Sequence, residues 1–162
     1  ATRWEQELYQ AVVGRGMSSA VAPEAQGDPG IAVYRELVRD FRRGNLAQTM
    51  RHTMTLLLLG LGAQGTSELL ECFFSGAPPE SYRAVEAHHF ACFLQAQPGL
   101  LERIRHLREV VDFEHALTRA TVFGEDTQVT WTADPVAILQ ALQRGEAPPD
   151  LPVVPSSMLV SA

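Results

Sequence analysis

The chain has 162 residues, which is enough for one domain with its own hydrophobic core. All thirteen basic residues are arginine, but acidic residues outnumber them and the net charge is −6. A general nucleic-acid binder needs a surplus of basic charge, so this balance argues against that class. The longest apolar run, Leu56 to Leu61, is far shorter than the roughly 20 residues of a membrane-spanning helix, and no secretory-type segment opens the sequence. We expect a cytoplasmic protein.

Apolar residues recur at helical spacing over the first part of the chain. Residues 3–13 predict a short amphipathic helix, and the glycines and prolines of residues 14–30 predict a loop. The next predicted helix has an apolar stripe on one side and arginines largely off it, and we expect it to end at Gly44 and Asn45. The stripe consists of Ile31, Tyr34, Leu37, Val38 and Phe41.

Four more helices are predicted before residue 121. One runs from Leu46 to the glycines at 60 and 62, a second follows Thr66, and a third covers residues 80–95. Pro98 is typical of a first helical turn, so the longest helix is expected from there to Ala120.

The character of the sequence changes at Val122. The alternating, β-branched segment Thr127 to Thr132 predicts a strand. Asp134 followed by Pro135 predicts the start of a helix that ends at Gly145, and two apolar segments, 151–154 and 158–160, predict final strands. The expected fold is mainly α with a small α+β C-terminal module: a helical domain over 1–121 and a strand-helix-strand unit over 122–162.

A sheet this small cannot close on itself, so at least one edge keeps unpaired backbone groups. Such an edge can accept an extended peptide as an additional strand. The sequence therefore offers a candidate peptide-binding segment, with a packing annex covered by its own loop as the alternative. The candidate peptide-binding residues are Thr127, Gln128, Val129, Thr130, Trp131 and Thr132.

No set of residues has the spacing of a known catalytic or metal-binding motif. Glu86, His89 and Cys92 share one helical face, and His106 can approach from the next helix, but core histidines and buried free thiols are the commoner arrangement. Glu114 lies on an apolar helix side and needs a partner such as Arg35. We predict no catalytic residues, no metal and no cofactor in this chain.

The arginines between residues 35 and 51 can contact an acidic protein surface or phosphate, and the alternative is an ordinary solvated helix face. They are the candidate partner-binding residues Arg35, Arg39, Arg42, Arg43 and Arg51. They also give the only support for a second function, that of a DNA-binding regulatory domain.

Several stretches, in this order, resemble the HvfC-type family over about residues 8–120. Gly30 to Arg35, followed by Arg39 and an apolar run to Gly60, resembles the opening of that family. The similarity continues in Pro78 to Ser81, in a later phenylalanine-rich helix, and in the helix from Leu107 to Ala116. The matching phenylalanine-rich positions are Phe90, Phe93 and Leu94. Residues 134–149 are similar to the tail helix of its MbnC and TglI relatives.

The resemblance implies a partner subunit that is not itself an enzyme. Its family members form heterodimers with multinuclear non-haem iron oxidative enzymes. These complexes modify cysteine or a nearby residue in ribosomally made precursor peptides, as in methanobactin or thiaglutamate-type natural-product biosynthesis. By resemblance, the helical part binds the enzyme, the C-terminal module captures the leader peptide, and the iron is held by the partner enzyme. Neither nucleic acid nor membrane is an expected partner.

Overall fold

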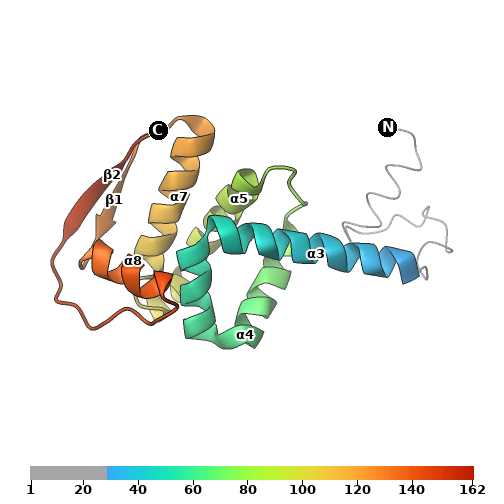
Figure 1. The fold of residues 1–162 in the computed structure, drawn as a ribbon, viewed down its shortest axis with the longest axis horizontal. Coiled ribbons are helices and arrows are strands. Elements are labelled where there is room, and N and C mark those ends of the chain that lie inside the picture. Colours follow the sequence, from blue (N-terminus) through green and yellow to red (C-terminus); the bar gives the residue numbers. More distant parts are fainter. Residues whose placement is uncertain (1–28) are drawn as a thin grey trace.

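The computed structural model describes residues 29–162, so the helix predicted over residues 3–13 lies outside the described part of the chain. The described chain is mainly helical with a small antiparallel sheet near its C-terminus, as predicted (Figure 1). No helix in this part is long and apolar enough to cross a membrane. The elements are α3 (Pro29–Thr49), α4 (Arg51–Gly76), α5 (Arg83–Gln95), α6 (Pro98–Arg103), α7 (Leu107–Phe123), β1 (Thr127–Trp131), α8 (Pro135–Gln143) and β2 (Ser156–Val160).

Helix α3 differs from its prediction in where it ends and in which side it buries. It continues through Gly44 to Thr49, because a glycine inside a helix costs only about 1 kcal/mol relative to alanine and the buried Arg42 and Leu46 hold both sides of it. Its N-terminal half extends away from the rest of the fold (Figure 1). The predicted apolar stripe is therefore largely exposed there, with Leu37 at 60% and Phe41 at 63%.

The two helices expected on either side of the glycines at 60 and 62 form one element, α4, which begins at Arg51 and not at Leu46 and is kinked at Gly62. Gly62 adopts φ 71°, ψ 176°, a positive-φ conformation that essentially only glycine adopts, and the helix resumes beyond it. The first turn of α4 is held by a residue from another helix. Glu114 of α7 accepts hydrogen bonds of 2.9 Å from the backbone N–H groups of His52 and Thr53.

This contact corrects the expected Glu114–Arg35 pair. A carboxylate at the positive end of a helix is favourable, and α4 lacks a capping side chain of its own at Met50. The buried Glu114 therefore has a structural role, as its apolar setting suggested, but with a different partner.

The single helix expected from Pro98 to Ala120 is two helices. Between α6 and α7 the chain turns inward at Ile104, which has extended φ and ψ, and His106 adopts a positive φ of 65°. Ile104 packs so closely on Gly60 that a Cβ at that glycine would lie 2.7 Å from the Ile104 side chain. The break therefore allows Ile104 to pack on another helix. A helical spacing of apolar residues does not reveal such a contact between helices.

The C-terminal module follows the local signals in the sequence. Asp134 accepts a hydrogen bond of 2.9 Å from the N–H of Val136 at the start of α8, and Gly145, with φ 76°, follows its end. Strands β1 and β2 pair antiparallel, with Val129 opposite Met158. The segment 151–154 forms no strand, but the Val154 N–H donates to Thr132 O.

One hydrophobic core joins the helical part and the C-terminal module. The buried side chains of β1, α8 and β2 belong to the same cluster as those of the helices, so the two predicted units are not separate in packing. Trp131 is fully buried and contacts Phe113 of α7, with ring centroids 5.7 Å apart. The sheet is thereby fixed on α7.

Candidate peptide-binding groove

Among residues 29–162, strand β1 has a neighbouring strand, β2, on one side only. The sheet has two strands, in the order β1-β2. In an antiparallel pair, alternate residues turn their N–H and C=O groups toward the neighbouring strand and the residues between turn theirs outward. The second edge of β1 therefore has backbone donors and acceptors that β2 does not use.

A groove of about 550 Å³ lies along β1. Most of its helical wall comes from one face of α7, where residues three and four apart lie side by side. These are Glu109, Asp112, His115, Ala116 and Arg119. The opposite wall is formed by Thr127, Gln128, Val129, Thr130 and Thr132 of the β1 segment, and no residue of β2 lines the groove.

The β1 residues in the groove come from both faces of the strand. Val129 is buried beneath the sheet, while Gln128 and Thr130 are exposed on the other face. Successive side chains of a strand point to opposite faces, so a groove that touches both runs along the edge. An extended peptide rises by about 3.4 Å per residue, as β1 does, so about five of its residues can pair along this five-residue strand.

Glu109 holds the groove's two walls together. Its Oε1 accepts a hydrogen bond of 2.6 Å from the backbone N–H of Thr132, and its Oε2 lies 2.8 Å from Nδ1 of His106. Burial by itself raises the pKa of Glu109, but the contacts with Thr132 and His106 outweigh it, and the pKa lies below its usual value. The carboxylate is therefore ionised and bound by donors from both sides.

Two buried polar atoms in the groove lack a hydrogen-bond partner in the described structure. They are Nε2 of His106 and Oγ1 of Thr127. The His106 side chain is only 5% exposed. Because a buried polar group without a partner costs free energy, these two atoms favour a ligand with hydrogen-bonding groups of its own. The backbone of an extended peptide has such groups.

Arg108 and Glu102 also line the groove. Both side chains are exposed, and neither has a partner among residues 29–162. Arg105, by contrast, is paired with Asp150 at 2.7 Å. The groove therefore presents one unpaired charge of each sign beside the strand edge.

The predicted partner-binding arginines divide into different environments. Arg42 is 4% exposed and bound to Glu86, so it is part of the interior and cannot contact a partner. Arg39 and Arg43 both lie within ion-pair distance of Glu71. Arg51 donates to the backbone oxygen of Gln143, and Arg35 is half-buried on the projecting half of α3.

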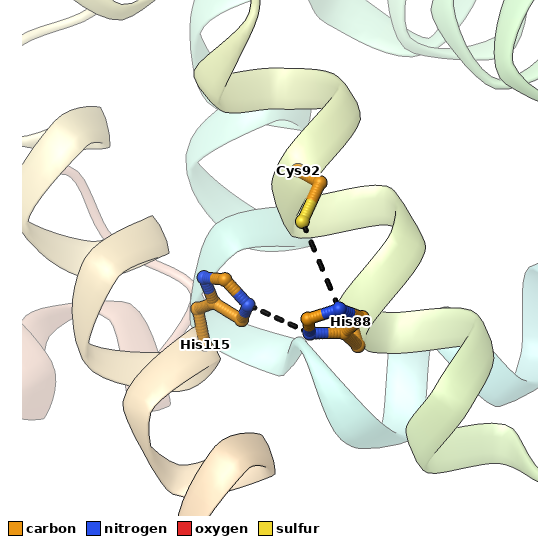
Figure 2. A group of neighbouring side chains, drawn as sticks. All are labelled: His88, Cys92 and His115. Atoms are coloured by element: carbon orange, nitrogen blue, oxygen red, sulfur yellow. Dashed lines mark hydrogen bonds between the residues drawn. The ribbon is translucent and has the colours of Figure 1, made fainter. Parts of the chain in front are cut away.

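A second cluster joins α5 and α7. Nδ1 of His88 lies 2.9 Å from Nε2 of His115, and Nε2 of His88 lies 3.9 Å from Sγ of Cys92 (Figure 2). Burial lowers the pKa of both imidazoles below the usual value, and the nearby positive charge of Arg119 lowers both further. His88 and His115 are therefore neutral at pH 7, the form of imidazole that binds metal.

The four residues weighed as a metal site from the sequence do not come together. Glu86 is buried against Arg42, His89 lies 3.4 Å from Glu80, and His106 contacts Glu109. Only Cys92 belongs to the cluster that the fold forms. Both cysteines are free, as expected, but they are exposed and not buried.

Comparison with protein-family models, with curated proteins and with solved structures gave no significant match. The HvfC-type resemblance therefore stays a prediction. What the structure contributes is a strand edge bordered by a groove, at the segment that was predicted to bind a peptide.

Proposed function

We propose that this chain is a non-catalytic subunit that holds an extended segment of a precursor peptide along the free edge of β1. The observation that carries this proposal is the groove between β1 and α7. Residues from both faces of β1 line it, and no residue of β2 does. A peptide there would add a third strand, and its main-chain hydrogen bonds would supply affinity.

Specificity would come from the side chains beside the edge. Alternate residues of an added strand face α7, where Asp112 and Arg119 lie, and the others face solvent near Gln128 and Thr130. The unpaired Arg108 and Glu102 favour a peptide with charges of both signs. His106 Nε2 and Thr127 Oγ1 would gain partners when the peptide is bound.

By its resemblance, this subunit would present the precursor to a multinuclear iron enzyme that modifies cysteine or a nearby residue. The exposed apolar side chains of α3 suit contact with such an enzyme. They are Val33, Tyr34 and Leu37 on the projecting half, and Phe41 just beyond it. Arg35, Arg39 and Arg43 lie on the same helix and can supply polar contacts around them. An apolar centre with a polar rim is the usual composition of a stable interface.

The proposal is tested by binding in two steps. Co-expression with the oxidative enzyme encoded beside its gene is expected to give a heterodimer that stays together at micromolar concentration. Labelled synthetic peptides that cover the short reading frames next to the gene are then titrated against the purified subunit by fluorescence anisotropy. If the two proteins elute separately, the proposal that this chain is an enzyme's partner subunit is wrong. If none of the peptides binds, the proposal that it holds a precursor peptide is wrong.

A matched pair of threonine variants locates the peptide. Thr127→Val removes the unpartnered hydroxyl in the groove, so it is expected to weaken peptide binding by about 3- to 10-fold, the value of one hydrogen bond. Thr121→Val removes a hydroxyl that bonds to Leu117 O and does not line the groove. It is expected to bind as the wild type does. Equal affinity for both variants would place the peptide elsewhere.

The structure weakens the support that the sequence offers for the DNA-binding alternative. The arginines on which it depends include Arg42, which is buried, and Arg39 and Arg43, which already pair with acidic side chains. Phosphate binding would have to displace those carboxylates. A shift of duplex DNA at low salt that disappears at high salt would favour this alternative.

A further inference from the structure

We propose that His88, Cys92 and His115 form a zinc site that joins α5 to α7. This inference does not rest on the peptide-binding function, although His115 also lines the groove. One ligand atom from each of the three side chains lies within 4.8 Å of the other two. Figure 2 shows the two imidazoles directed toward each other, with the thiol one helical turn from His88.

The local structure explains why these residues meet. His88 and Cys92 are four residues apart on α5, so their side chains lie on the same helix face. His115 approaches from α7, which packs against α5. The three ligands thus come from two fixed helices, and a bound ion would link segments that are 27 residues apart in sequence.

The distances are close to those of a tetrahedral zinc centre. Zn–N bonds of about 2.0 Å and Zn–S bonds of about 2.3 Å place neighbouring ligand atoms about 3.3 to 3.5 Å apart. The 2.9 Å separation from His115 involves Nδ1 of His88, whereas the 3.9 Å separation from Cys92 involves Nε2, and only one of these nitrogens can bind the ion. With one nitrogen from each histidine and the Cys92 sulfur, the three ligand atoms lie within 4.8 Å of one another, so a bound ion requires them to move closer together by about an ångström.

The donor set selects the kind of metal. A thiolate with two imidazoles suits Zn²⁺, whereas Mg²⁺ and Ca²⁺ prefer oxygen ligands. The nearby charge of Arg119 would repel a cation, but its guanidinium is paired with Glu125 at 2.6 Å, which offsets that repulsion.

Three protein ligands leave a fourth position for water or another ligand. Cys92 is exposed and His88 is half-buried, so that position opens toward solvent. The ring of Phe123 contacts His88, with centroids 5.2 Å apart. An open fourth position distinguishes this arrangement from a closed structural zinc site, in which four protein ligands surround the ion.

The test uses the full chain, reduced and free of metal, titrated with Co²⁺ and then with Zn²⁺. One equivalent of Co²⁺ is expected to give tetrahedral visible bands and a thiolate-to-cobalt charge-transfer band, and Zn²⁺ is expected to displace it. Cys92→Ser should abolish the charge-transfer band and weaken Zn²⁺ binding by more than about 100-fold. His88→Gln should weaken Zn²⁺ binding by a similar factor.

Two matched variants serve as controls. Cys72→Ser removes the other free cysteine, and His89→Ala removes the neighbouring histidine outside the cluster. Both are expected to bind one equivalent as the wild type does, and far-UV circular dichroism without metal should be the same for all variants. The proposal is overturned if the wild type gives no thiolate–cobalt band, if the band persists in Cys92→Ser, or if Cys72→Ser loses it.

Discussion

The backbone N–H of Thr132 donates a 2.6 Å hydrogen bond to the buried carboxylate of Glu109, and this contact joins the end of β1 to the start of α7. The same carboxylate holds His106, whose positive φ allows the chain to turn between α6 and α7. One side chain therefore fixes the turn, the helix and the strand that together border the groove.

Glu109→Gln is expected to lower the free energy of unfolding by about 1.5 to 3 kcal/mol, the contribution of hydrogen bonds to a charged group. The amide can still accept one hydrogen bond, but it lacks the charge that favours both donors. Urea unfolding monitored by tryptophan fluorescence, to which the buried Trp131 contributes, measures the change. The control is Glu102→Gln, which replaces an exposed carboxylate that also lines the groove. It should change the free energy of unfolding by less than about 0.5 kcal/mol.

Glu109 also predicts a specific acid dependence. Its pKa in the folded chain lies below the usual 4.5, so folding favours the ionised form. The stability that this group contributes is fully present above pH 4.5 and is lost as the pH falls through the lower, folded-state pKa. The difference in unfolding free energy between wild type and Glu109→Gln should therefore shrink below pH 4.5. A difference that stays constant down to pH 2.5 would contradict the assigned role.

The Arg42–Glu86 pair predicts a large loss when one partner is removed. Nε and Nη2 of Arg42 lie 2.8 and 2.7 Å from Oε1 of Glu86, and both side chains are at most 5% exposed. Glu86→Gln leaves a buried guanidinium without its counter-charge, which costs about 3 to 5 kcal/mol.

The double variant Arg42→Met, Glu86→Leu should recover most of this loss, because two apolar side chains leave no buried charge. Glu146→Gln, which breaks the exposed pair with Arg144, is the control and should cost less than about 1 kcal/mol. Chemical denaturation of all four proteins gives these values. A double variant less stable than Glu86→Gln would show that the pair contributes more than charge compensation.

The C-terminal module was predictable because its signals are local. A β-branched alternation, Asp134 before Pro135 and a glycine after the helix each specify backbone geometry within a few residues. The segment Thr127 to Thr132 was therefore located correctly as a strand. Which of its edges stays free depends on how β1 pairs with β2 and packs on α7, and that is tertiary information.

The helical part was less predictable for the same reason. An apolar stripe identifies a helix, but burial depends on whether another element covers that stripe, and Phe41 is exposed while Arg42 is buried. The α7 wall of the groove has helical spacing at 109, 112, 116 and 119, a pattern visible in the sequence. It was not recognised because these mixed residues look like an ordinary solvated face.

The metal-ligand cluster shows how one helical position decides a site. His88 and His89 are adjacent on α5, and only His88 faces α7. The sequence pattern favoured His89 because its spacing to Glu86 and Cys92 is three. Four residues, as between His88 and Cys92, also place two side chains on one face, so spacing alone did not choose between them.

Hydrogen exchange of the β1 amides with and without a bound precursor peptide tests the central claim most directly. If the peptide adds a strand, the outward-facing N–H groups between Thr127 and Trp131 become hydrogen-bonded, and their exchange slows by at least about 10-fold. The amides of β2 and of α3 should keep their rates. Peptide binding that leaves the β1 amides unchanged and protects another element would contradict the account.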